Sequence, residues 1–276
     1  MYKQFGVREI CNVVFKTKAS NQKVGNTTIE DAGTPVIYFD SLKTSSIEGA
    51  STTVYAQGGR GNPRLIAWEG ERTVTFTMED ALISPIGFAM LSGAGLVTKT
   101  GETAITHITQ RFVKSDTPEE TNVVNTQPIY ALYFKGDEML SIKKVGSIEA
   151  AITGIGTDSG DKNADAVLVD FYAKVPTELT QIDIEPDKFG GNFYIEAETL
   201  FRDKDGKDHA AEFIIPNGKI QSNFTFTMAS SGDPSTFTFT VDAFPGYTIY
   251  DNTKKVMACL QIADGEFVLE EKKEAE

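Results

Sequence analysis

Alternation of apolar and polar residues marks three stretches of this 276-residue chain as strands with one buried face. They are residues 72–78, 219–228 and 235–244, and in each the bulky apolar side chains take one face and threonines the other. In 219–228 the apolar positions are Ile220, Phe224, Phe226 and Met228. In the other two stretches the apolar positions are Val74, Phe76, Met78, Phe237, Phe239 and Val241, and the threonines are Thr73, Thr75, Thr77, Thr236, Thr238 and Thr240. Threonine and phenylalanine both favour pleated strands, so pattern and propensity agree.

Residues 192–244 are predicted to form a four-stranded antiparallel meander. Asn217-Gly218 is read as a hairpin turn because both residues tolerate positive φ, and short connections make neighbouring strands antiparallel. The strands are expected at 192–202, 210–215, 219–228 and 235–244, with the other turns at 203–207 and 230–234.

Elsewhere the chain also reads as mainly β. One clear helix is predicted, capped by Ser84, with Pro85 in its first turn and Gly93 at its end. A second, less regular helical pattern covers 138–145. Further strands are expected at 10–16, 36–40, 103–114, 129–135, 166–174, 247–251 and 255–262, and loops at 115–128 and 155–165.

The domain organisation expected from these patterns is a single β domain over residues 1–276. Residues 17–34 and 41–63 read as extended N-terminal loops, because they are polar and rich in turn formers. The least regular pattern lies near 115–165, a candidate inserted module, and the acidic end 270–276 is expected to fray.

Charge and cysteine content exclude several classes of protein. Lys plus Arg is 26 and Asp plus Glu is 39, a net charge of −13, which disfavours tight binding to a nucleic-acid backbone. The chain has neither the roughly 18-residue apolar run of a membrane helix nor the pattern of a signal peptide. Two cysteines are too few for a disulfide scaffold and fit a reducing compartment.

Candidate catalytic chemistry is nearly absent from the sequence. His107 and His209 are the only histidines and neither lies in a catalytic or metal-binding motif, while Cys11 and Cys259 are expected to be buried, inert thiols. The acidic turn 203–208 lacks the glycine spacing and closing Glu of a calcium loop, and the glycine-rich 57–63 lacks the context of a phosphate loop. We therefore expect no catalytic, metal-binding or cofactor-binding residues.

Two passages carry a resemblance to a known family. Residues 57–93 run from a glycine-rich loop through Trp68, the only tryptophan, and an alternating strand to Glu79-Asp80-Ala81-Leu82 and the helix. Residues 218–245 hold a Thr/Phe hairpin around Gly232-Asp233-Pro234. In this order the features resemble the tail tube proteins of long-tailed bacteriophages.

The resemblance implies a mainly β fold, an antiparallel β-sandwich or partly closed barrel with one short flanking helix. It implies a structural virion protein, not an enzyme, whose copies form rings that stack into a hollow tail tube through which DNA passes without sticking. The partners implied are the chain itself and the tail sheath, baseplate, terminator or tape-measure proteins, with no membrane. The location implied is the virion tail, assembled in the host cytoplasm.

Two sets of residues gain a role under this resemblance. The loops 17–34 and 41–63 would be stacking arms, and the contact residues between subunits would be Arg60, Arg64, Trp68 and Arg72. An acidic lumen would repel DNA phosphates, and the candidates for its wall are Thr73, Thr75, Thr77, Thr236, Thr238 and Thr240. Simple β-propensity at solvent-facing positions explains these threonines equally well.

Other classes of function stay open on the sequence. Related virion proteins (a tail terminator, a baseplate component or a capsid decoration protein) would share a β-rich fold without forming long tubes. A carbohydrate-binding β-sandwich is a further alternative, but such modules expose several aromatic residues, whereas most phenylalanines here fall on the apolar side of alternating strands.

Overall fold

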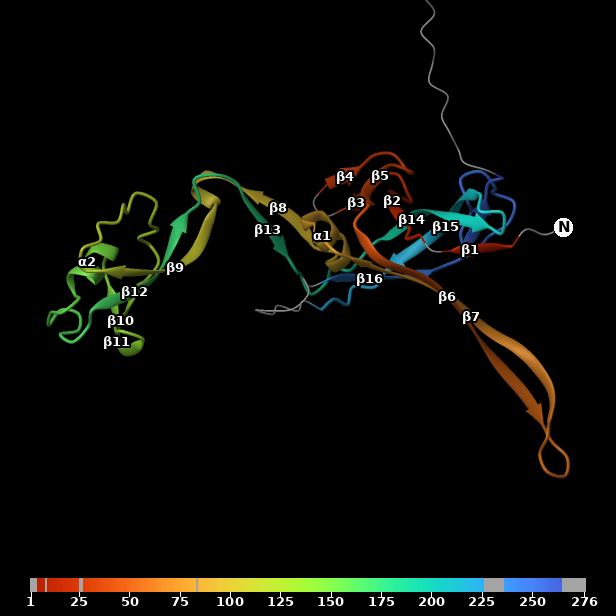
Figure 1. Ribbon diagram of the computed structural model, residues 1–276, viewed down its shortest axis with the longest axis horizontal. Coiled ribbons are helices and arrows are strands. Elements are labelled where there is room, and N and C mark those ends of the chain that lie inside the picture. Colours follow the sequence, from red (N-terminus) through yellow and green to blue (C-terminus); the bar gives the residue numbers. More distant parts are fainter. Residues whose placement is uncertain (1–3, 8, 25–26, 83, 226–235, 265–276) are drawn as a thin grey trace, which may run out of the picture. The chain divides into compact units, whose positions relative to one another are not determined.

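The computed structural model describes residues 4–7, 9–24, 27–82, 84–225 and 236–264 and is mainly antiparallel β-sheet (Figure 1). Contacts divide the chain into two units, which are described separately. The first unit combines Met1–Leu96 with Ile182–Glu276, and the second is Val97–Gln181. The segment 115–165 lies within the second unit.

The first unit is built on one large sheet whose neighbouring strands run antiparallel. Its order is β5 (Pro35–Phe39), β2 (Asn12–Thr17), β14 (Asn192–Asp203), β15 (Asp208–Ile220), β16 (Phe237–Ala243), β7 (Arg64–Asp80) and β6 (Leu42–Gln57). β1 (Phe5–Val7) adds to β14 and β17 (Cys259–Ile262) adds to β15. In the described residues β5 and β6 do not pair with each other, so the sheet is not a closed barrel.

The apolar face of this sheet encloses the core of the first unit. The alternation predicted for β7 and β16 is observed, since Phe76, Met78 and Phe239 are buried while the threonines between them are not. Helix α1 (Pro85–Ser92) adds Met90 and Leu91 to this core. As predicted, Ser84 caps the helix, its Oγ accepting from the Gly87 N–H at 3.0 Å, and Gly93 ends it with a φ of 69°.

The predicted four-stranded meander is wrong, because β15 continues through Asn217-Gly218 and ends at Ile220. In the described residues of 192–244 the strands are β14, β15 and β16, residues 221–225 form no strand, and the rest of the predicted strand 219–228 lies outside the described residues. The register of β15 against β14 shifts between Phe193 and Ile195, so Pro216-Asn217 forms a bulge and not a turn. Gly218 serves close packing here, since a Cβ would lie 2.6 Å from Ile195 Cδ1 and 2.7 Å from Val241 Cγ1.

Several other predicted elements are corrected. Residues 138–145 form a strand, β11 (Glu138–Val145), because their side chains alternate on a sheet edge. Most of the predicted loop 41–63 is strand β6, and 17–34 contains the short hairpin of β3 (Gln22–Val24) and β4 (Thr27–Ile29). Residues 247–251 form no strand. The predicted turn 230–234 and the tail 270–276 lie outside the described residues.

The second unit has its own sheet and core. The strand order is β11, β10 (Ile129–Lys135), β12 (Ala166–Lys174) and β9 (Ile105–Val113), all antiparallel. A second helix that the sequence did not predict, α2 (Ile148–Thr153), packs against buried residues of β10 and β12. The short 3₁₀ turn η1 (Gly101–Thr103) precedes β9, and a separate two-stranded sheet pairs β8 (Gly95–Lys99) with β13 (Leu179–Asp183).

Candidate assembly surfaces

The β6–β7 hairpin continues past the other strands of its sheet as a two-stranded arm (Figure 1). β16 pairs with β7 only over Thr75–Asp80, whereas β6 pairs with β7 out to Gln57 opposite Arg64. We call residues 51–72 the arm. Every described residue of β7 from Arg64 to Thr73 is exposed, so the arm has no core beneath it.

One face of the arm is apolar. Val54 lies opposite Trp68 and Ala56 opposite Ile66, which puts these side chains on the same side of the ribbon. The large members are well exposed: Val54 by 61%, Ile66 by 54% and Trp68 by 53%. We call Val54, Ile66 and Trp68 the arm patch. An isolated two-stranded ribbon is marginally stable in water, so the patch is suited to burial against another surface.

The arginines predicted as contact residues lie at different levels of the hairpin. Arg60 is exposed in the tip turn, and the Arg64 guanidinium lies 4.1 Å from the centre of the Tyr55 ring. Arg72 lies at the base of the arm, where it lines a groove of about 420 Å³ with Val74 and Phe213. Arg64 and Trp68 both lie on the arm but on opposite faces, because Tyr55, which Arg64 covers, alternates along β6 with Val54, the partner of Trp68. The structure therefore does not bring the predicted contact residues together at one site.

The two predicted threonine series form one continuous polar surface. Thr77 lies directly opposite Thr240, and Thr75 opposite Asp242, on the face of β7 and β16 that points away from the core. β6 extends this surface, with Ser46 opposite Thr77. We call Thr75, Thr77, Thr238 and Thr240 with these neighbours the threonine face. Thr73 continues it toward the arm, and Thr236 directly precedes β16.

Carboxylates outnumber cations on the threonine face. Glu79, opposite Thr238, accepts hydrogen bonds from the hydroxyls of Thr236 and Thr44, and these lower the pKa of Glu79, with Thr236 the larger cause. Glu48 and Asp242 add two carboxylates, and Lys219 faces Asp242 from β15. The face is therefore polar, largely uncharged and slightly acidic. Sequence periodicity predicted each threonine row, but not the strand register that joins the rows.

The histidines and cysteines lie at separate places in the fold. His107 is exposed on β9 with its Nε2 2.8 Å from Asp170 Oδ2, whereas His209 is fully buried in the first unit. Burial raises the pKa of the Cys11 thiol, while Cys259 on β17 is only half-buried, so the prediction that both are buried holds for Cys11 alone.

The acidic turn 203–208 uses its carboxylates internally. Asp203 Oδ1 accepts the backbone N–H groups of Asp205 and Lys207, each at 2.9 Å, and Asp208 forms a two-point ion pair with Arg202 at 2.6 and 2.7 Å. Within the described ranges, no group of three or more His, Cys, Asp or Glu residues is placed to hold a metal ion. No helix among the described residues has the length and apolarity to span a membrane.

Comparison with known proteins bears on the whole of this architecture. Comparison with curated proteins gives no match. A family model described as the YomU/Tube protein family matches residues 22–258, a range that holds the arm, the threonine face and all of the second unit. The chain therefore belongs to the YomU/Tube protein family, in agreement with its resemblance to phage tail tube proteins.

Proposed function

We propose that copies of this chain assemble into rings that stack into the hollow tail tube of a phage, and that DNA passes through this tube. Membership of a tube family makes the chain a structural component of a phage tail. Ring formation, stacking, assembly in the host cytoplasm and DNA passage are the proposed steps. The partners proposed are other copies of the chain, with sheath, baseplate, terminator or tape-measure proteins at the tube surface or ends.

The observation that carries the proposal is the arm with its exposed apolar patch. Val54, Ile66 and Trp68 contribute nothing to the core of their own subunit, yet they gather on one side of a ribbon that reaches beyond the sheet. Burying such side chains against a neighbouring copy would stabilise the contact by about 25 cal/mol for each Å² removed from water. A head-to-tail contact of this kind propagates into a filament when it does not close on itself.

The threonine face supports the proposed lumen. Its hydroxyls are uncharged, and the three carboxylates of Glu48, Glu79 and Asp242 outnumber the two nearby cations of Lys43 and Lys219. A surface with this balance repels the DNA backbone weakly.

Electron microscopy and sedimentation velocity test the assembly directly. We expect the wild-type chain to form rings or uniform hollow tubes as it is concentrated, or when baseplates nucleate it. Trp68→Ala should shift the material to monomers, whereas Phe189→Ala, which truncates a more exposed aromatic residue outside the arm, should assemble. A wild-type chain that stays monomeric even with baseplates would contradict the proposal, and capsid or tail-end binding would then identify another virion part.

The lumen assignment needs a separate test. Replacing Thr238 and Thr240 by Lys should leave the tubes intact and slow DNA ejection, because cations in the channel would bind phosphates. Thr109→Lys on β9 adds the same charge to a different sheet and is the control. Unchanged ejection kinetics in the double variant would show that this face does not line the channel.

A further inference from the structure

The groove at the base of the arm is an open, mostly apolar surface of the first unit. Besides Arg72, Val74 and Phe213, its walls come from β6 and from the segment 256–260, which runs into β17. Ile47, Val74 and Phe213 pack from the groove onto the core of the unit. Every residue that lines the groove is half-buried or exposed, so the core ends here without a cover from the described part of the same chain.

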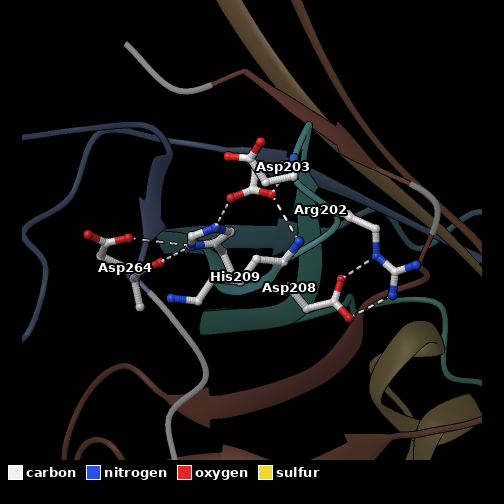
Figure 2. A network of polar contacts seen from close by, with 8 residues as sticks. Arg202, Asp203, Asp208, His209 and Asp264 are labelled. Carbon is white, nitrogen blue, oxygen red and sulfur yellow. Dashed lines mark hydrogen bonds and ion pairs between the residues drawn. The ribbon is translucent and has the colours of Figure 1, made fainter. Parts of the chain in front are cut away.

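The wall formed by β17 is held in place by contacts within the copy. β17 pairs along β15, with Leu260 opposite Phe213. Just after the strand, Nδ1 of the buried His209 lies 3.2 Å from the carbonyl oxygen of Ala263, and Nε2 lies 2.9 Å from Asp203 Oδ2 (Figure 2). The groove is therefore formed before a partner binds.

The arm patch matches the groove in chemistry and in size. Val54, Ile66 and Trp68 carry no charge and are each more than half exposed. The groove holds about 420 Å³, more than ten times the roughly 30 Å³ that one water molecule occupies in the liquid, so it has room for a large side chain such as the indole of Trp68. Contact between the two surfaces would remove apolar area from water on both sides.

A copy cannot place its own patch in its own groove. β6 pairs with β7 at both levels, with Gly49 opposite Val74 beside the groove and Val54 opposite Trp68 in the patch. These levels are five residues apart (54 − 49) along an extended strand, or about 16 Å at about 3.3 Å per residue. Reaching the groove would fold the ribbon back on itself and break this ladder, so the occupant comes from another molecule.

Charge favours a second copy of the chain as that molecule. The arm has three arginines and two glutamates, a net charge of +1, and the whole chain has −13, which leaves −13 − 1 = −14 outside the arm. Acidic surfaces of two copies repel each other, whereas the arm is attracted to them. The arm is therefore the part of one copy best suited to approach another.

We propose that the arm patch of one copy docks in the groove at the base of the arm of the next copy. Trp68 and Val54 then cover Phe213 and Leu260, and the core of the receiving copy gains the cover that its own chain does not provide. Because the patch and the groove are different surfaces, each copy offers one of each and the contact repeats head to tail. This inference rests on the proposed assembly and names the surface that receives the arm.

Cross-linking between two variants tests the contact. Val54→Cys puts a thiol in the patch and Leu260→Cys puts one in the groove, both in chains with Cys259→Ser, so that the native half-buried thiol does not compete. The two variants are mixed, concentrated with baseplates present and oxidised with copper–phenanthroline, and we expect a disulfide-linked heterodimer. Tyr55→Cys in place of Val54→Cys is the control. It should give about tenfold less cross-link, because Tyr55 lies on the other face of the arm and a disulfide forms only at short range.

A substitution in the groove measures what the contact contributes. Leu260→Asn should raise the protein concentration at which rings or tubes appear by about tenfold, because a polar side chain replaces an apolar one at the contact. Ile262→Asn changes a similarly exposed residue of β17 outside the groove lining, so it should assemble like the wild type. Sedimentation velocity measures both, and if Leu260→Asn fails to fold, the cross-link decides.

The outcomes distinguish this inference from the tube proposal. Tubes that form without a cross-link between positions 54 and 260, or with equal cross-linking from Tyr55→Cys, would overturn the docking site and leave tube assembly standing. A cross-linked heterodimer in chains that never form rings or tubes would support the docking site and contradict tube assembly. Neither assembly nor cross-link would overturn both.

Discussion

The two halves of the β6–β7 hairpin share the same strands and the same pairing, yet they lie in opposite environments. Near the sheet, β7 lies between β6 and β16, and Phe76 and Met78 are buried to 2% and 0% exposure. In the arm, β6 is the only described strand that pairs with β7, and Trp68 is 53% exposed. Backbone pairing thus continues where the core ends.

This difference separates two uses of apolar residues on a single strand. Near the sheet they stabilise the subunit, whereas in the arm they offer a surface that the subunit itself does not cover. Apolar arm residues should consequently affect assembly far more than folding.

The largest expected effect is the loss of a buried ring from β7. Phe76→Ala should lower the free energy of unfolding by about 3–5 kcal/mol, because it removes buried area and leaves a cavity. Ile66→Ala on the same strand, at an exposed arm position, should change it by less than about 0.5 kcal/mol. Urea denaturation of the unassembled chain measures both, and similar losses would contradict the comparison.

Two glycine substitutions, one near the sheet and one in the arm, test the same difference in packing, and the expected loss of stability is of intermediate size. Gly218→Ala would press a Cβ against the buried side chains of Ile195 and Val241 and should cost about 1–3 kcal/mol. In the arm, a Cβ at Gly70 would lie 2.5 Å from the exposed Thr52 hydroxyl, which can rotate away at the cost of its hydrogen bond from the Glu71 N–H. Gly70→Ala should therefore cost less than Gly218→Ala. Equal costs in denaturation would mean that the arm is as tightly packed as the core.

The smallest expected effect concerns acid stability at Glu79. The pKa of Glu79 is lowered, chiefly by the Thr236 hydrogen bond. Ionised Glu79 therefore stabilises the folded chain above the ordinary carboxyl pKa, and this stabilisation is lost as pH falls through the lowered pKa. Glu79→Gln should therefore flatten the pH dependence of unfolding on the acidic side. The urea midpoint measured from about pH 3 to about pH 7 checks this. Glu71→Gln in the arm is the control. The same flattening in Glu71→Gln would mean that the hydrogen bonds of Glu79 near the sheet are not its cause.

Local pattern predicted the elements whose signals lie within a few residues. The period-two alternation of β7 and β16 appears in the structure as buried and half-exposed faces, and Ser84 and Gly93 bound α1 as their capping chemistry requires. Such signals can be read without knowing the partner of each segment.

By itself, then, the sequence determined the mainly β class, the alternating faces and one helix. Tertiary structure decided that Asn217-Gly218 is no turn but the end of a bulge and a paired strand residue, because close packing of Gly218 against Ile195 and Val241 outweighs the turn preference. It also decided that Thr77 meets Thr240 and that His209 meets the Ala263 carbonyl. Each of these depends on register between segments distant in the chain, where many pairings satisfy the same local pattern and only the shared core selects one.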